Sequence, residues 1–156
     1  MTRTDYFHDP DAPSPNSIKV AVSALVQDDE GRILLIRRTD NGKHSIPGGG
    51  LEAGETITQA VEREVREETG IEVAIVQLVG VFSDPDHVIA YEDGEVRQEF
   101  SICFRAKPTG GALRPSDESS EVEWVTPEEL INRDIHPSIQ LRIRKALDDA
   151  SEPYFT

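Results

Sequence analysis

The chain is poor in cysteine and in long apolar runs, and each shortage excludes a class of protein. Its 156 residues include one cysteine, Cys103, so no disulfide can form within the chain, and the surrounding apolar run FSICF predicts a buried thiol. No stretch is apolar over the length of a membrane span, and the polar, proline-rich start lacks the apolar segment of a signal peptide. We therefore expect a cytoplasmic protein with no membrane partner.

Basic residues are scarce as well. Sixteen lysines and arginines stand against thirty aspartates and glutamates, which gives a formal net charge of -14 and an isoelectric point near 4.6. This excess of negative charge repels nucleic acid, so nucleic acid is not an expected partner. An acidic site in such a chain could bind a phosphate-bearing ligand only with a cation between them. The composition leaves open whether the chain acts alone or as a homodimer.

Length and residue pattern predict an α+β fold in a single domain. Residues 1–17 contain three prolines and few aliphatic side chains, so we expect an extended N-terminal arm without regular structure. Residues 18–150 form the expected domain, and residues 151–156 a C-terminal tail.

Apolar and β-branched runs place the expected strands, and glycines and prolines place the loops. Strands are predicted over 18–26 and 33–38, paired as a hairpin within 20–38, over 73–83, over 88–106 as a hairpin turning at 92–94, and over 121–125. Loops are predicted over 39–44, at the glycine run 47–50, over 84–87 and over 107–120. Helices are predicted over 56–69, from a capping box at 126–129, and over 137–149.

The helix predicted over Thr56–Thr69 carries glutamates on an unexpected face. On a helical wheel, Glu64, Glu67 and Glu68 continue the apolar stripe instead of joining the polar face. Carboxylates turned toward the protein repel one another and lose hydration, at a cost on the order of several kcal/mol each. A bound cation removes that cost, and oxygen ligands select Mg²⁺, Mn²⁺ or Ca²⁺. The helix is therefore predicted to hold a divalent cation.

The segment from Gly49 to Ile71 resembles the Nudix box. The family pattern is a glycine, five residues, a glutamate, seven residues, and then Arg-Glu-aliphatic-any-Glu-Glu-any-Gly-aliphatic. The chain reads Gly49, GLEAG, Glu55, TITQAVE and REVREETGI, so every specified position matches. The resemblance implies an α/β/α sandwich around a mixed β-sheet. It also implies Mg²⁺- or Mn²⁺-dependent hydrolysis of the pyrophosphate bond in a nucleoside diphosphate linked to another moiety, such as a nucleotide sugar.

Site residues follow from the same resemblance. Glu64 and Glu68 are the implied direct metal ligands, Glu67 is a ligand or part of a second metal site, and Gly48 supplies a carbonyl oxygen. Glycines suit such a position because backbone without a side chain can approach a ligand closely. In addition, Arg63 is expected to pair with Glu55 and so fix the loop to the helix, through the bidentate geometry that arginine and carboxylate favour.

The base that takes a proton from the attacking water is not specified by the resemblance. A glutamate of the box is one candidate. Glu118 and Glu121, in the acid-rich segment before the last strand, are two others, and for each of them a solvated loop acid is the competing interpretation. Glu121 is favoured over Glu118 because it adjoins the strand over 122–125 and is better anchored.

Substrate contacts are expected outside the box. Arg37 and Arg38 end a strand near the 39–44 loop, where one of them could reach a phosphate. His44 stands where relatives commonly have a tryptophan, so a base-stacking role there is in doubt. His87 could line a pocket, although an ordinary loop histidine is the simpler interpretation.

Alternative functions remain at this stage. A nucleoside triphosphate pyrophosphohydrolase that cleanses the nucleotide pool fits the same box. A nucleotide-binding regulatory module without catalysis would show degenerate box positions, and none is present. A Ca²⁺-binding structural domain of the EF-hand type would need an aspartate-rich loop that the chain lacks.

Overall fold

The computed structural model describes residues 3–148 and 150–156. This part of the chain folds into two β-sheets and two α-helices. The larger sheet is mixed. Its strands follow the order β1-β6-β7-β2-β5, β2 runs parallel to β7, and β9 pairs with β6. These strands are β1 (Arg3–Phe7), β2 (Ser17–Val26), β5 (Gly48–Gly50), β6 (Ile71–Tyr91), β7 (Val96–Gly111) and β9 (Tyr154–Phe155). The smaller sheet, in the order β4-β3-β8, contains β3 (Ile33–Arg38), β4 (His44–Ser45) and β8 (Ser119–Val125).

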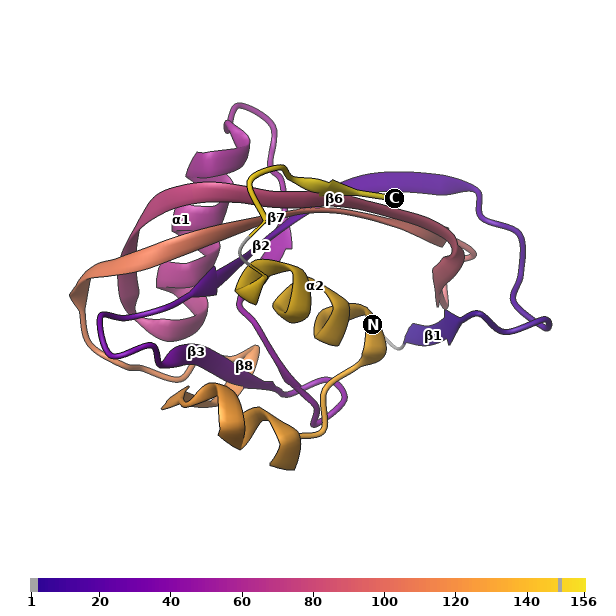
Figure 1. The fold of residues 1–156 in the computed structure, drawn as a ribbon. Helices are drawn as coiled ribbons and strands as arrows, with labels where there is room; N and C mark the ends of the chain where they lie inside the picture. The colour runs from indigo at the N-terminus through magenta and orange to yellow at the C-terminus, as the bar shows by residue number, and fades with distance from the viewer. Residues whose placement is uncertain (1–2, 149) are drawn as a thin grey trace.

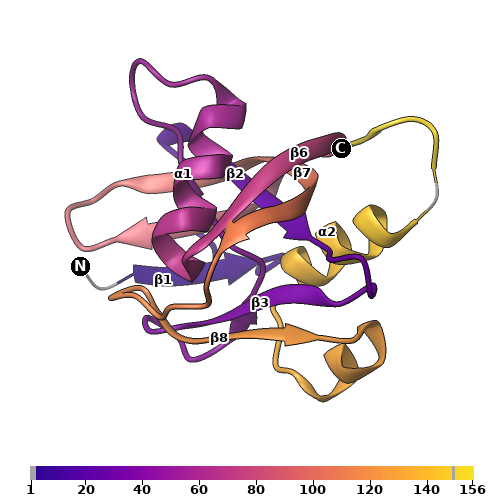
Figure 2. The ribbon, with the colours of Figure 1, turned by 90° about the vertical axis from the view of Figure 1, so that its left-hand side faces the viewer.

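The helices α1 (Ile57–Thr69) and α2 (Pro137–Leu147) lie on opposite faces of the larger sheet (Figures 1 and 2). Successive side chains of a strand face opposite sides of a sheet. Accordingly, Val22 and Ala24 of β2 belong to the apolar cluster that α1 covers, and Leu25 belongs to the cluster that α2 covers. Figure 1 shows α2 between the larger sheet and strands β3 and β8. The predicted α/β/α sandwich around a mixed sheet is confirmed.

Both predicted ends of α1 are confirmed. The Thr56 hydroxyl accepts a hydrogen bond from the Gln59 N–H, and the Gln59 side chain accepts one from the Thr56 N–H, which makes a capping box. Gly70 closes the helix with φ at 79°, a left-handed conformation that suits glycine. These local signals fix where the helix begins and ends, and therefore which glutamates it buries.

The other two predicted helices are present. A second capping box, between Thr126 and Glu129, opens the short 3-10 helix η1 (Pro127–Asn132). α2 begins at Pro137 as predicted and ends at Leu147. The predicted last residue of this helix, Asp149, lies outside the described residues, as do residues 1 and 2 of the N-terminal arm.

The predicted hairpin over residues 20–38 is wrong. Both hydrogen-bonding edges of β2 are already used, one by β7 and the other by β5. Within the described residues, backbone pairing toward β3 is limited to one bridge, between Gln27, just after β2, and Ile33. The Asp28 carboxylate accepts hydrogen bonds from the N–H groups of Glu30 and Arg32, and this turn directs the chain into the smaller sheet.

The start of the chain also differs from the prediction. Residues 3–7, expected to be irregular, form strand β1, which pairs antiparallel with the edge of β6 so that Arg3 lies opposite Tyr91 and Phe7 opposite His87. The prolines of the arm, which cannot donate backbone hydrogen bonds, all follow this strand. An open sheet edge can pair with a polar segment because the bonds come from its backbone. Residues 3–7 thus lie beside a strand from the middle of the chain.

Some predicted loops are wholly or partly strand. The affected segments are the glycine run (β5), residue 44 (β4), residues 84–87 (within β6), residues 107–111 (within β7) and residues 119–120 (within β8). The glycine run can pair with β2 because backbone hydrogen bonds need no side chain. The register of β6 shifts between Asp84 and Val88, and such a bulge accommodates Pro85 within a strand.

Candidate active site

The buried face of α1 carries two of the three glutamates that the helical wheel turns inward. Glu64 is 8% exposed and Glu68 is 4% exposed, so their inward orientation is confirmed. The predicted inward orientation of Glu67 is wrong, because its side chain is 58% exposed. This residue lies at the edge of the apolar stripe, where its carboxylate stays in solvent and contacts Arg63 at 3.3 Å.

A third carboxylate joins the buried pair from a distant part of the sequence. Ligand oxygens of Glu64, Glu68 and Glu118 all lie within 4.8 Å of one another. Glu118 is exposed, and the residue after it, Ser119, donates a hydrogen bond of 2.6 Å to the Glu68 carbonyl, which ties the loop to the end of α1. We call these three residues the carboxylate cluster. It offers only hard oxygen donors, the chemistry that suits Mg²⁺ or Mn²⁺.

The glycines of β5 allow the cluster to form. A Cβ atom at Gly49 would overlap the carboxylate of Glu64, and a Cβ atom at Gly48 would overlap the Val22 carbonyl. Any side chain at either position would therefore displace the glutamate or the strand. The Gly48 N–H also points at the cluster, 3.4 Å from an oxygen of Glu68.

The electrostatics of the cluster favour a bound cation. Burial, together with the negative charge of Glu64, raises the pKa of Glu68 to about 9, although the Arg38 charge and the Gly48 N–H act in the opposite direction. Without a cation, Glu68 therefore holds a proton at neutral pH. A divalent ion supplies the positive charge that this proton otherwise provides, so these residues fit a metal site.

The raised pKa makes the stability of the metal-free protein depend on pH. Above the unfolded-state value of 4.5 and below about 9, the unfolded chain has released the Glu68 proton while the folded chain retains it. Stability should therefore fall as pH rises, by up to about 1.4 kcal/mol per pH unit. Denaturant unfolding in EDTA between about pH 5 and 8 measures this slope. Glu68→Gln should flatten it, and Glu62→Gln, an exposed glutamate of the same helix, should not. An equal slope in all three proteins would contradict the assignment.

Arg63 connects the helix to the loop before it. Its guanidinium forms the predicted bidentate pair with Glu55, at 2.6 and 2.9 Å, so the pairing is confirmed. The same group donates to Glu64 at 2.8 Å and to the Gly50 carbonyl at 3.0 Å. These contacts raise the pKa of Arg63, chiefly through the Glu55 hydrogen bond, and keep it charged. Arg63 thereby positions the first glutamate of the cluster and neutralises part of its charge.

Loss of Arg63 should destabilise the fold. Both partners of the Arg63–Glu55 pair are mostly buried, at 16% and 17% side-chain exposure, so Arg63→Ala should cost about 2–4 kcal/mol, between the values for exposed and fully buried pairs. Arg66→Ala is the matched control, because Arg66 is exposed on the same helix and forms no ion pair within the described residues. Thermal unfolding should separate the two variants by several degrees. Equal melting temperatures would show that Arg63 acts as a free surface charge.

A cleft of about 300 Å³ crosses the larger sheet and reaches the carboxylate cluster at Glu118, whereas Glu64 and Glu68 do not line it. Its floor is formed by alternate residues of neighbouring strands, which share one face of the sheet: Arg3 and Asp5 of β1, His87, Ile89 and Tyr91 of β6, Arg97, Glu99 and Ser101 of β7, and Lys19, Ala21 and Ser23 of β2. The glycines of β5 and Glu118 bound one end. The start of α2 forms the opposite wall, through His136, Ser138 and Arg142.

The charge of the cleft differs from that of the whole chain. Six basic residues line it, namely Arg3, Lys19, Arg38, Lys43, Arg97 and Arg142, against three acidic ones, Asp5, Glu99 and Glu118. Within the described residues, the buried side-chain atoms without a hydrogen-bonding partner are Ser23 Oγ, His44 Nδ1 and Arg142 Nε. All three belong to residues that line this cleft. Each of the six basic side chains also pairs with a carboxylate. The cleft therefore offers a phosphate-bearing ligand a set of basic groups held in place, together with polar atoms that have no partner.

The remaining predicted site residues fall inside and outside the cleft. Arg38 and His44 line it, and Arg38 is held by a bidentate pair with Asp40 at 2.7 and 2.9 Å. Arg37 instead pairs with Glu121 at 3.2 Å in an exposed position. The structure thus brings Glu118, and not the favoured Glu121, to the two buried glutamates.

No strong sequence signal marks the far end of the cleft. Asp5 lies in a segment expected to be irregular, His87 in a segment expected to be a loop, and His136 immediately before a helix. The cleft joins them only because β1 pairs with β6 and α2 packs over the sheet. Neither segment shows the alternation of polar and apolar residues that marks a strand with one solvated face, because residues 3–5 are all polar and Ile89 faces the cleft.

A larger apolar groove, of about 570 Å³, lies between η1 and α2 and is lined by residues such as Leu130, Ile131 and Leu147. It contains no member of the carboxylate cluster, so the smaller, charged cleft is the better candidate for chemistry.

Within residues 3–148 and 150–156, no helix is both long enough and apolar enough to cross a membrane.

With a helix on each face of a mixed sheet, the protein is an α/β/α sandwich. Its carboxylate cluster, beside a cleft lined by basic residues, has the features of an enzyme active site. The NUDIX domain model matches residues 17–147, so the chain belongs to the NUDIX family and is a Nudix hydrolase. The resemblance read from the box is thereby confirmed.

Individual relatives agree with this assignment. The chain is 41% identical over 140 residues to a MutT-like protein of Streptomyces ambofaciens, a match that covers 90% of this chain and 84% of the relative. It is 39% identical over 113 residues to the ADP-ribose pyrophosphatase of Methanocaldococcus jannaschii, covering 67% of this chain and 60% of that protein. Among solved structures, a NUDIX hydrolase from Nitrosomonas europaea superposes with a TM-score of 0.69 at 26% identity, covering 90% of this chain and 77% of that one.

Proposed function

We propose that the chain uses Mg²⁺ or Mn²⁺ to hydrolyse the pyrophosphate bond of a nucleoside diphosphate linked to another moiety, such as a nucleotide sugar. The observation that carries this proposal is the carboxylate cluster at one end of a basic cleft. The cluster suits a hard divalent cation, and the six basic residues suit phosphates. A relative that is 39% identical is named an ADP-ribose pyrophosphatase, which supports the substrate class.

In this proposal, Glu64 and Glu68 hold the cation from the buried face of α1. When bound, such an ion polarises a phosphoryl oxygen and lowers the pKa of an attacking water. Glu118, exposed on its loop beside the buried pair, accepts the proton of that water as general base. Arg63 fixes Glu64 in place and Arg38, anchored by Asp40, faces the phosphates. Glu67, on the exposed side of the helix, contributes to a site for a second cation.

The proposal is tested by metal removal followed by a substrate panel. After treatment with EDTA, turnover of nucleoside diphosphate sugars should cease, and Mg²⁺ or Mn²⁺ should restore it. The two products identify the bond that is cut, and water labelled with ¹⁸O should place the label in a phosphate. Undiminished activity after rigorous metal removal would contradict the mechanism. Label in a sugar hydroxyl would contradict cleavage of the anhydride.

A nucleoside triphosphate is the competing substrate class. The same panel decides between the two, because a triphosphate pyrophosphohydrolase should release inorganic pyrophosphate from triphosphates faster than it cleaves nucleotide sugars. A protein that binds both classes tightly in the presence of metal but cleaves neither would instead be the regulatory module.

A further inference from the structure

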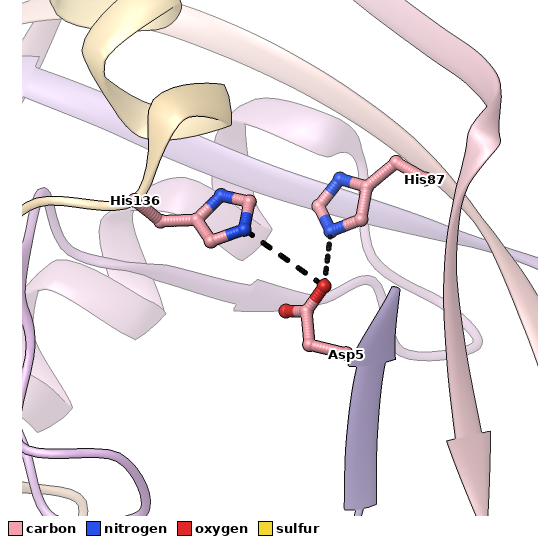
Figure 3. Close-up of side chains that lie close together, drawn as sticks. All are labelled: Asp5, His87 and His136. Carbon is pink, nitrogen blue, oxygen red and sulfur yellow. Dashed lines mark hydrogen bonds and ion pairs between the residues drawn. The ribbon is translucent and has the colours of Figure 1, made fainter. Parts of the chain in front are cut away.

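A cluster of one carboxylate and two imidazoles closes the end of the cleft opposite the carboxylate cluster. Figure 3 shows Asp5, His87 and His136 pointing toward one another from β1, β6 and the start of α2. His87 Nε2 lies 2.9 Å from Asp5 Oδ1, and His136 Nε2 lies 3.9 Å from the same oxygen. Phe7 packs edge-on against both imidazoles and holds them, with ring centroids 5.2 and 5.1 Å away. We call these three polar residues the distal cluster.

The hydrogen bonds of the distal cluster determine which atoms carry protons. The Nδ1 atom of His136 accepts the Ser138 N–H at 3.1 Å as the cap of α2, so a neutral His136 carries its proton on Nε2, which faces the cleft. Asp5 is an acceptor, so His87 donates to it through Nε2–H. Burial lowers the pKa of His136, which keeps this imidazole neutral at ordinary pH. Both imidazoles therefore present N–H groups toward Asp5.

These protons argue against the metal site that two histidines and an aspartate would otherwise suggest. A metal binds the lone pair of an imidazole nitrogen, and here both Nε2 lone pairs are replaced by N–H bonds. Two groups remain for a ligand, Asp5 Oδ2 and the Nε2–H of His136. Within the described residues, Asp5 Oδ2 has no hydrogen-bonding partner. A negative acceptor beside a neutral donor repels phosphate and suits a group that both donates and accepts, such as a hydroxyl.

The distal cluster and the carboxylate cluster belong to two parts of one cleft. Arg3, two residues before Asp5 on β1, lies 3.7 Å from Asp40, and Asp40 also pairs with Arg38, which lines the cleft together with Glu118. A ligand that contacts both clusters must therefore carry a group beyond its phosphates, which free pyrophosphate lacks. Basic side chains of the intervening strands, including Lys19 and Arg97, line the path between them.

The aromatic content of the cleft favours a sugar over a base at this position. Besides histidines, the one aromatic residue among the described residues lining the cleft is Tyr91, and the Arg97 guanidinium already lies over its ring at 4.7 Å. The two imidazoles of the distal cluster stack on each other, with centroids 5.1 Å apart. Little aromatic surface is therefore left for stacking on a nucleobase, whereas hydroxyl groups need none.

We propose that Asp5 and His136, supported by His87, bind the hydroxyl groups of a sugar ring in the substrate. The inference rests on the proposed function and narrows it to ligands that carry such a ring next to the phosphates. Asp5 belongs to β1, which precedes residues 17–147, the segment that the family model matches. Either the distal sugar or the ribose of the nucleoside could supply the hydroxyls, and experiment separates the two.

The test is the affinity of non-hydrolysable ligands, which does not depend on turnover. The α,β-methylene analogues of ADP-ribose, ATP and 2′,3′-dideoxy-ATP are titrated into the protein with Mg²⁺ by calorimetry. The variants are Asp5→Asn, which retains shape, and His136→Asn, whose side chain can still cap α2 but has no N–H in the same position. Asp11→Asn is the control, because it removes the same charge from an exposed residue of the N-terminal segment.

If the distal sugar occupies the site, Asp5→Asn and His136→Asn should weaken only the ADP-ribose analogue, by roughly 10- to 100-fold. If the nucleoside ribose occupies it, the ADP-ribose and ATP analogues should both weaken and the dideoxy analogue should not. Equal weakening of all three ligands, or of none, would overturn the proposal, as would Zn²⁺ bound by these three side chains. Binding without turnover in the wild type would remove the proposed function alone, and absence of binding by every analogue would remove both.

Discussion

Replacing either buried glutamate of α1 should remove most of the activity. Glu64→Gln and Glu68→Gln are each expected to lower kcat by roughly tenfold to several hundredfold at saturating metal, as loss of a metal ligand commonly does. The physical reason is that glutamine retains the shape of the side chain but not the charge that holds a hard cation. Both variants should fold, and in metal-free buffer at neutral pH Glu68→Gln should melt at a slightly higher temperature, because folding no longer requires the uptake of the proton that Glu68 holds.

The matched control is Glu62→Gln, which removes the same charge from an exposed position of the same helix. Steady-state kinetics over a range of Mg²⁺ concentrations separate weaker metal binding from slower chemistry. Wild-type kcat in either buried variant at saturating metal would show that the residue does not hold the catalytic cation.

Glu118→Gln should have the second large effect. If Glu118 is the general base, the variant should lower kcat by about 10²–10⁴-fold while metal affinity stays nearly unchanged. Glu121→Gln is the control, because Glu121 is close in sequence but pairs with Arg37 outside the cluster. It should remain near wild type.

Direct measurement of Mn²⁺ affinity separates the two roles that Glu118 could have. A large fall in affinity together with the fall in kcat would assign Glu118 as a metal ligand. Wild-type kcat in Glu118→Gln would remove the loop from the mechanism and return the base to the box.

The parts of the fold that could be predicted from sequence were those set by local interactions. Capping at Thr56, the left-handed Gly70 and the spacing of apolar residues depend on neighbours within one or two turns, and they placed α1 correctly. Because Glu64 and Glu68 lie within its apolar stripe, their burial followed. Glu67 lies at the edge of that stripe, and its side chain is exposed. A helical wheel gives the direction of a side chain but does not show whether other elements bury it.

Features that depend on distant pairing were not predictable in this way. The apolar and β-branched sequence pattern of β2 and β3 predicts strands, but it does not show whether the two strands pair with each other or enter different sheets. The choice was made by β7 and β5, which occupy both edges of β2. The preference for Glu121 over Glu118 failed to anticipate the contact of Ser119 with the end of α1, which brings the preceding residue to the cluster.

The distal cluster illustrates the same limit. Asp5, His87 and His136 are far apart in the sequence, and each has an ordinary local context. They meet because an N-terminal strand pairs with the far edge of the sheet while a C-terminal helix caps the same face.

The central claim is that Glu64 and Glu68 hold a divalent cation at the end of the basic cleft. The most direct test is anomalous X-ray scattering from crystals of the protein soaked with Mn²⁺. We predict an anomalous peak within bonding distance of the Glu64 and Glu68 carboxylates, adjacent to Glu118. Absence of a peak there, or a peak only among Asp5, His87 and His136, would contradict the account.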